Sequence, residues 1–463
     1  MPPPTPELTD DLVGEFLLRI PPDDDPACLL RASLVCKRWR RILADPAFRR
    51  RHRALHQAPH VFGYLQVVDS GILYSSRFVT INTASRRPVR CDLPGWRVLD
   101  CRHGRALFMT QAPGSPDDGV VDFIVWDPLT DEQHRLPRPS SPPMLVDLFT
   151  AAVLCAAATR GCDHRGCHGD PFRVVFISTT ITPAAECVTS ARVYSSETRD
   201  WSELTSVQHP AAYVHHLTCF STLVGDTLYF FGKNYTIGYQ PDAQRLSVID
   251  PPPQSMYNGK LRFLRLVDDG GCLGFVCVEE DPSFCIRLLS RETTLDGVAR
   301  WAQGRVIKLD TLLANVTLPP PSHPCGVTGA RVIGVAQGTD AIFVYITKDE
   351  RSDVYMIHLK SGRAKKLGPF RPSPVFPYVS FCIPGQQQAK PVSSAIYNRC
   401  MARLTNRDSR SNAVLPIATG APAASTSDGI RRVAVPVPKT LNVPIVMDAA
   451  SSGERLRQGV LGA

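Results

Sequence analysis

The stretch from residue 8 to residue 52 constrains the fold most, because helix starts and helix stops alternate along it at short intervals. Thr9 or Asp10 can cap a first helix, and Pro21-Pro22 ends it. Asp25-Pro26 and Asp45-Pro46 each place a capping carboxylate before a proline, which the first turn of a helix tolerates. The pattern therefore predicts a small all-α domain of three helices over residues 7–56.

Apolar side chains repeat at helical spacing inside each of these predicted helices. In the first helix they are Leu12, Val13, Phe16, Leu17 and Ile20. Helices this short cannot bury so much apolar surface against one another. We therefore expect something outside the three helices to cover the remainder.

The same stretch resembles the F-box, a helical module that recruits an adaptor protein. The matching elements follow in the family's order, and Thr9 stands where the family usually has proline. The resemblance covers about a tenth of the chain, and its several spaced elements make it more specific than one short motif. The elements are Leu8, Leu12-Val13, Ile20-Pro21, Leu29-Leu30-Arg31, Val35-Cys36-Lys37-Arg38-Trp39 and Pro46-Ala47-Phe48.

The resemblance implies a non-catalytic substrate receptor of a Skp-cullin-F-box ubiquitin ligase. The helices of such a receptor bind the Skp adaptor and through it a cullin, while the remaining chain holds a target protein for ubiquitination. The implied contact is a helix in an apolar groove with a few buried anchors. The residues implied for adaptor binding are Leu8, Leu12, Val13, Ile20, Pro21, Leu30, Val35 and Trp39.

The middle of the chain, from about residue 60 to residue 384, changes to short β-rich runs separated by Gly, Pro, Asp and Ser turns. A strand, a polar turn and a second strand recur, with turns near residues 127, 196, 240, 290 and 360. Two further turns begin at residues 225 and 270, 45 residues apart, which is close to the length of a four-stranded propeller blade. Longer intervals imply insertions, the plainest of which spans residues 137–170.

These repeats predict an all-β, propeller-like domain of about six blades over residues 57–385. They loosely resemble the kelch-like associated domains of plant F-box proteins, in which the element His103-Gly104-Arg105-Ala106-Leu107 has a counterpart. A Greek-key β-sandwich is the alternative fold. Residues 1–6 and the tail 386–463, which holds Tyr397 as its one aromatic residue, are predicted to be disordered.

Charge and hydropathy exclude two classes of partner. Ten basic and four acidic residues follow residue 388, so +6 of the net charge of +9 lies in the tail and the folded part is nearly neutral. We therefore expect no nucleic-acid partner. No apolar run reaches the roughly 18 residues of a membrane helix, and the N-terminus has no secretory signal. We expect no membrane partner and a cytoplasmic or nuclear location.

One group of candidate metal ligands stands out, in the predicted insertion. Zinc needs four nitrogen or sulfur ligands, and strong sequence signals show two separated pairs rather than one crowded cluster. A flexible surface loop is therefore the favoured interpretation, and we expect no metal or other cofactor. The candidate ligands are Cys155, Cys162, Asp163, His164, Cys167 and His168.

No motif indicates an enzyme. The sequence has no Gly-x-Ser-x-Gly elbow, no phosphate-binding loop and no dinucleotide fingerprint. The alternative to the receptor hypothesis is a stand-alone β-propeller that binds a ligand or catalyses a reaction, with an incidental helical cap.

Overall fold

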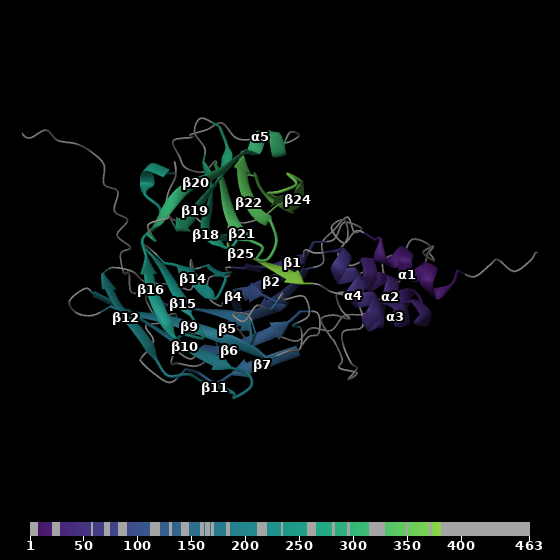
Figure 1. Ribbon diagram of the computed structural model, residues 1–463, viewed down its shortest axis with the longest axis horizontal. Helices are drawn as coiled ribbons and strands as arrows, with labels where there is room; N and C mark the ends of the chain where they lie inside the picture. Colours follow the sequence, from purple (N-terminus) through teal and green to yellow (C-terminus); the bar gives the residue numbers. More distant parts are fainter. Residues whose placement is uncertain are drawn as a thin grey trace, which may run out of the picture. The chain divides into compact units, whose positions relative to one another are not determined.

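The computed structural model shows a helical region followed by an all-β domain (Figure 1). The predicted disordered segments 1–6 and 386–463 lie outside the described residues. The residues that the structure describes are 8–20, 28–56, 59–68, 75–81, 90–111, 121–128, 132–139, 148–157, 162, 167, 171–181, 186–210, 220–232, 235–256, 265–279, 283–293, 297–313, 329–348, 351–369 and 373–380.

The helical region contains α1 (Asp10–Leu18), α2 (Cys28–Val35), α3 (Lys37–Ala44) and α4 (Pro46–Leu55). The middle helix of the three predicted is divided at Cys36, where the backbone is extended (φ −158°, ψ 165°) and Sγ accepts a hydrogen bond from the Trp39 amide at 3.4 Å. Cys36 therefore ends α2 and caps α3. The core of the region consists of Val13, Leu17, Leu18, Leu29, Ala32, Leu43 and Phe48.

Two of the predicted helix caps are present. The Thr9 hydroxyl accepts a hydrogen bond from the Leu12 amide at 3.4 Å. The Asp45 carboxylate accepts from the amides of Ala47 and Phe48 at 3.2 and 3.3 Å, with Pro46 in the first turn of α4. Side-chain acceptors at these positions satisfy amides that have no partner within the helix. None of the described helices is long and apolar enough to cross a membrane.

The β domain consists of six antiparallel sheets. Strands are given from the innermost outward. Blade 1 consists of β25 (Val375–Ser380), β1 (His60–Val67), β2 (Ser75–Thr80) and β3 (Arg90–Pro94), and blade 2 of β4 (Trp96–Arg102), β5 (Arg105–Gln111), β6 (Val121–Asp127) and β7 (Glu132–Leu136). Blade 3 consists of β8 (Phe149–Cys155), β9 (Phe172–Ile181) and β10 (Glu186–Ser195), with β11 (Asp200–Trp201) and β12 (Thr205–Pro210) both paired to β10.

The other three sheets repeat this order. Their strands are β13 (Ser221–Val224), β14 (Thr227–Phe231), β15 (Thr236–Gln240) and β16 (Arg245–Ile249); then β17 (Arg265–Asp269), β18 (Cys272–Glu279), β19 (Cys285–Thr293) and β20 (Ala299–Lys308); then β21 (Gly329–Val335), β22 (Ala341–Lys348), β23 (Arg351–His358) and β24 (Ala364–Pro369). A 3-10 turn (η2, Gln254–Met256) and a short helix (α5, Leu309–Leu312) lie between strands.

Six apolar clusters occupy the junctions between neighbouring sheets, one at each junction. The cluster between sheets one and two, for example, joins Leu65 and Phe78 to Phe108 and Trp126. Because the cluster between sheets six and one is also present, the sheets close into a ring. The domain is therefore a β-propeller, and the predicted six blades are confirmed.

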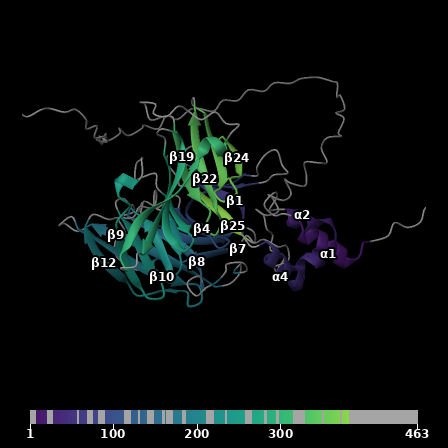
Figure 2. The ribbon, with the colours of Figure 1, turned by 45° about the horizontal axis from the view of Figure 1, so that its top comes forward.

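The last described strand closes the ring. β25 pairs with β1 in antiparallel register, for example Leu65 with Phe376, so blade 1 is built from both ends of the domain. The two strands lie side by side in both views (Figures 1 and 2). Tyr378 is fully buried, and its hydroxyl lies 3.3 Å from the Asp127 carboxylate of blade 2. Closure therefore depends on contacts between residues far apart in the sequence.

Two predicted features of the repeat are wrong. The insertion expected at residues 137–170 contains β8, which is buried at all seven positions and is the innermost strand of blade 3. The turn expected near residue 290 falls within β19, which continues to Thr293. The first error arises because a strand buried on both faces lacks the alternating pattern of a half-exposed strand. The second arises because the outer end of β19 is polar and partly exposed, as a turn usually is.

Gly334 marks the tightest contact at the closing junction. A Cβ at this position of β21 would lie 2.5 Å from the Val375 carbonyl oxygen of β25. We expect Gly334→Ala to destabilise the propeller by about 1–3 kcal/mol, the usual cost of overpacking, because backbone cannot move aside as a flexible side chain can. Chemical denaturation of the full chain measures this loss. Gly14→Ala, where the nearest atom lies at 3.8 Å, is the control that should cause no such loss.

Candidate functional site

A row of exposed apolar side chains begins just before α1 and continues along it. Leu8, Leu12 and Phe16 are spaced four residues apart and are 63%, 56% and 62% exposed. Val35, at the end of α2, is 66% exposed. Large apolar residues exposed in a row on one helix are unusual for a surface that faces water alone. This α1 row is the candidate docking site of the helical region.

Arg38 connects the start of α1 to the start of α3. Its guanidinium donates to the Leu8 carbonyl oxygen and forms an ion pair with Asp10, to which Arg41 is also paired at 3.1 Å. The hydrogen bond from Arg38 is the largest cause of a lowered pKa at Asp10. Since Arg38 follows Val35 by three residues, these contacts bring the end of α2 close to Leu8. The exposed side chains of Leu8 and Val35 therefore lie at the same end of the helical region.

The structure places the predicted adaptor-binding residues in three groups. Leu8, Leu12 and Val35 are exposed. Val13 is buried at 4% exposure, and Ile20 and Trp39 pack partly buried against the same core, so these three side chains shape the surface from beneath. The side chain of Leu30, which lies in α2, and all of Pro21 are outside what the structure describes.

Phe16 is a site residue that the sequence prediction omitted. It belongs to the apolar face predicted for the first helix, and its spacing of four residues from Leu12 places it beside the exposed leucines. The prediction took Leu12, Val13 and Ile20 from this face for adaptor binding and left out Phe16, whereas the structure buries Val13 and leaves Phe16 exposed.

Polar side chains connect blades across the centre of the propeller. Arg102 at the end of β4 pairs with Asp100 through two contacts of 2.8 and 3.0 Å, with side-chain exposures of 1% and 7%. Arg102 also donates to the Ser221 carbonyl oxygen at 3.2 Å, and the Val153 amide of β8 donates to Asp100 at 2.8 Å. Gln337, beyond β21, donates to the same Ser221 oxygen at 2.9 Å. Blades 2, 3, 4 and 6 are thereby joined.

Aromatic and basic side chains fill another part of the centre. Phe220, just before β13, stacks on Phe376 of β25 with ring centroids 5.4 Å apart, although their blades lie on opposite sides of the ring. The Arg265 guanidinium of β17 lies 4.5 Å from the Phe220 ring. Burial, with a smaller contribution from Arg331, lowers the pKa of Arg265 to about 10. These described side chains occupy space that an open channel would need.

An open groove lies where blade 3 meets the β15–β16 turn of blade 4, with a volume of about 550 Å³. Its lining includes Trp201 and Gln244, and an ion pair between Arg173 and Asp242 at 2.6 Å joins the two blades there. The Trp201 indole donates outward to the Pro137 carbonyl oxygen at 2.9 Å. The groove presents mixed polar and aromatic side chains without a catalytic grouping among the described residues.

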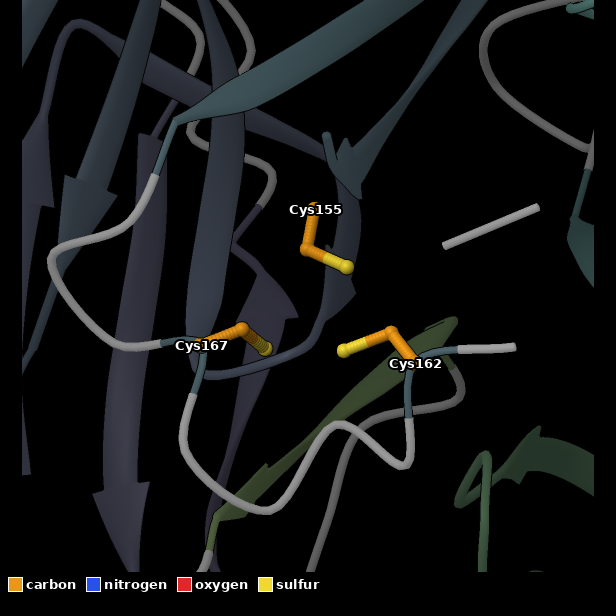
Figure 3. Close-up of side chains that lie close together, drawn as sticks. All are labelled: Cys155, Cys162 and Cys167. Atoms are coloured by element: carbon orange, nitrogen blue, oxygen red, sulfur yellow. The ribbon is translucent and has the colours of Figure 1, made fainter. Parts of the chain in front are cut away.

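Three cysteines converge at the inner end of blade 3 (Figure 3). Cys155 ends β8, and the sulfur atoms of Cys155, Cys162 and Cys167 all lie within 4.8 Å of one another. Cys155 and Cys167 are buried, so they do not belong to an exposed loop surface. The hydrogen bond with the Cys167 thiol, followed by burial, raises the pKa of Cys155. The other candidate ligands, Asp163, His164 and His168, lie outside the described residues.

Comparison with known proteins gives a family match that falls on the helical region. A model of the F-box-like family matches residues 15–54. No curated protein matches the chain. The chain is similar to the β-propeller domain of the Trilobed protease from Pyrococcus furiosus (10% identity, TM-score 0.33, 67% of this chain and 84% of that chain). It is also similar to TolB from Acinetobacter baumannii (10% identity, TM-score 0.37, 71% and 69%).

The F-box-like match begins within α1, at residue 15, and extends through α2 and α3 to residue 54 in α4. It includes Phe16 of the α1 row and the Asp45 cap, whereas Leu8, Thr9 and Leu12 precede it. The six closed sheets follow it directly in the sequence. The chain therefore consists of a short F-box-like helical region followed by a six-bladed β-propeller.

Proposed function

We propose that this chain is the substrate-recognition subunit of a Skp-cullin-F-box ubiquitin ligase. The observation that carries the proposal is the exposed α1 row of Leu8, Leu12 and Phe16, which leads into the helices that match the F-box-like family from residue 15 onward. An exposed row at this spacing suits insertion into an apolar groove of a partner. The partner is the Skp adaptor, which links the chain to a cullin.

Thr9 is compatible with this role although the F-box pattern usually has proline there. Its backbone angles, φ −67° and ψ 160°, are close to those that proline itself adopts. The path of the chain between Leu8 and α1 is thus one that proline also permits, and the hydroxyl adds a helix cap. The substitution therefore keeps the geometry of the docking surface.

In this proposal the propeller holds the target protein and catalyses nothing. Binding a target beside the ligase raises the effective concentration of its lysines near the ubiquitin-loaded enzyme. Because side chains of opposite blades touch across the described centre of the ring, we infer that the target binds surface loops rather than the channel. A kelch-like type, a plant source and a cytoplasmic or nuclear location remain predictions within the same proposal.

Leu12→Asp tests the proposal directly. A charge in the middle of the α1 row should weaken binding of the full chain to purified Skp adaptor by at least tenfold, or about 1.4 kcal/mol, because an anchor residue would enter the groove charged. Titration calorimetry measures the affinity. Leu204→Asp, on a propeller residue that is 44% exposed, introduces the same charge away from the helices and should bind as the wild type does.

Circular dichroism of both variants controls for loss of folding. Equal weakening by Leu12→Asp and Leu204→Asp would show that added charge, rather than the α1 row, sets the affinity. Absence of binding by the wild-type chain at low salt overturns the receptor proposal and favours the stand-alone propeller instead.

A further inference from the structure

The three converging thiols have a geometry close to that of a zinc site. In a tetrahedral site with Zn–S bonds of about 2.3 Å, neighbouring sulfur atoms are about 3.8 Å apart. The sulfur atoms of Cys155, Cys162 and Cys167 already lie within 4.8 Å of one another and point inward to a common centre (Figure 3). Small side-chain rotations therefore suffice to bring all three to one ion.

The backbone of each cysteine is held by groups outside the cluster. The Cys155 amide donates to His103 Nδ1 at 3.1 Å, and Arg105 donates to the Cys167 carbonyl oxygen at 2.9 Å. The Cys162 amide donates to the Ala157 carbonyl oxygen at 3.3 Å. These contacts fix the backbone from which each thiol projects, which limits the reorganisation that metal binding would require.

The ends of the intervening segment are also joined. The Ala156 amide donates to the Pro171 carbonyl oxygen at 2.8 Å, where β8 ends and β9 begins. Cys162 and Cys167 therefore lie close to Cys155 at the end of β8. Cys101 and Cys277 lie in other apolar clusters, and the described residues contain no other group of three metal-binding side chains this close.

We propose that Cys155, Cys162 and Cys167 bind one Zn²⁺ ion through their three sulfur atoms, with a non-sulfur ligand completing the tetrahedron. Binding replaces the three thiol protons, which pass to solvent, and involves no oxidation. Three thiolates and Zn²⁺ carry a net charge of −1, and the guanidinium of Arg105 beside Cys167 partly offsets it. The ion fixes the segment after β8 against the core between blades 3 and 4.

The sequence alone favours no metal at these cysteines, whereas their arrangement in the structure favours zinc. The sequence shows one crowded cluster, whereas the structure shows that Cys155 belongs to an inner strand and meets two cysteines that follow it by 7 and 12 residues. The proposal is independent of adaptor binding, since it concerns the propeller alone.

Metal analysis of the full chain, purified under reducing conditions without chelator, tests the proposal. We expect about one zinc per chain, released on thiol modification. Cys162→Ser, at the partly exposed member of the cluster, should reduce the zinc content at least tenfold while circular dichroism stays unchanged. Cys272→Ser, at a partly exposed cysteine outside the cluster, is the matched control and should retain the zinc.

Cobalt substitution reports the ligands. The cobalt form should show tetrahedral d–d bands and sulfur-to-cobalt charge-transfer bands, and X-ray absorption of the zinc form should fit three sulfur ligands and one nitrogen or oxygen. Zinc content that is negligible in the wild type, or equal in the wild type and Cys162→Ser, overturns the proposal. A disulfide between two of the three cysteines in the reduced, freshly purified chain overturns it as well.

Discussion

A chain that ends after Pro369 should fail to form a stable propeller, whereas one that ends after Ser380 should fold as the full-length protein does. The first truncation removes β25, the strand that closes blade 1 by pairing with β1. The second keeps every described strand. The two variants differ by eleven residues, and a thermal melt followed by circular dichroism distinguishes them.

The size of the effect follows from the burial of this one strand. Val375, Phe376, Tyr378 and Val379 are all at most 8% exposed. Burying a large apolar side chain contributes about 1.5–3 kcal/mol, so four contribute about 6–12 kcal/mol. That range is comparable with the whole stability of a typical domain, about 5–15 kcal/mol. Losing β25 also exposes the edge of β1 to association with other chains.

For each truncated chain, one result would contradict this expectation. If the chain ending after Pro369 melts cooperatively at the temperature of the full-length protein, blade 1 is stable without its innermost strand and the ring need not be closed. If the chain ending after Ser380 is destabilised, residues beyond the described strands contribute to the fold.

The helical region could be predicted closely because its signals are local. A capping residue acts on amides two or three positions away, so the roles of Thr9 and Asp45 are apparent in the sequence itself. The division at Cys36 was missed because a thiol cap followed by a basic helix carries no proline or glycine signal.

The sequence predicted that the β domain is a propeller, but it did not predict every strand or which strands pair. Turns such as Gly225-Asp226 recur at the length of a blade, and this period is visible in the sequence. The pairing of β25 with β1 joins residues more than 300 positions apart, and no local pattern indicates it. β8 was not predicted because its burial on both faces gives a continuous apolar run without alternation.

The sequence indicated where the candidate sites lie, but it did not indicate which of their side chains are exposed or meet in space. The α1 face was predicted, yet which of Val13 and Phe16 faces the core depends on how α1 packs on α3 and α4. The cysteine cluster was identified, yet its convergence depends on the end of β8 meeting the following segment.

Arg102→Met should be the most damaging single substitution at the centre of the propeller. Arg102 and Asp100 form an ion pair that is almost completely shielded from water. Removing one partner leaves the Asp100 carboxylate buried without its countercharge, which typically costs about 3–5 kcal/mol. The substitution also removes the hydrogen bond to Ser221 that joins blade 2 to blade 4. Denaturant unfolding of the full chain measures the loss.

A second substitution separates charge from packing. Asp100→Asn keeps an oxygen that can accept from the Val153 amide but removes the charge, so the Arg102→Met, Asp100→Asn double variant should be more stable than Arg102→Met alone. Lys366→Met is the matched control, because Lys366 pairs with Asp353 at 2.7 Å while its side chain is 54% exposed, and such pairs contribute about 0–1 kcal/mol.

If Arg102→Met costs no more than Lys366→Met, the buried pair contributes no more than a surface pair and does not hold the blades together. If it costs several kcal/mol and Asp100→Asn recovers part of that loss, the charge of Asp100 requires Arg102 beside it. In that case the polar contacts through Ser221 and Val153 are a structural element of the ring.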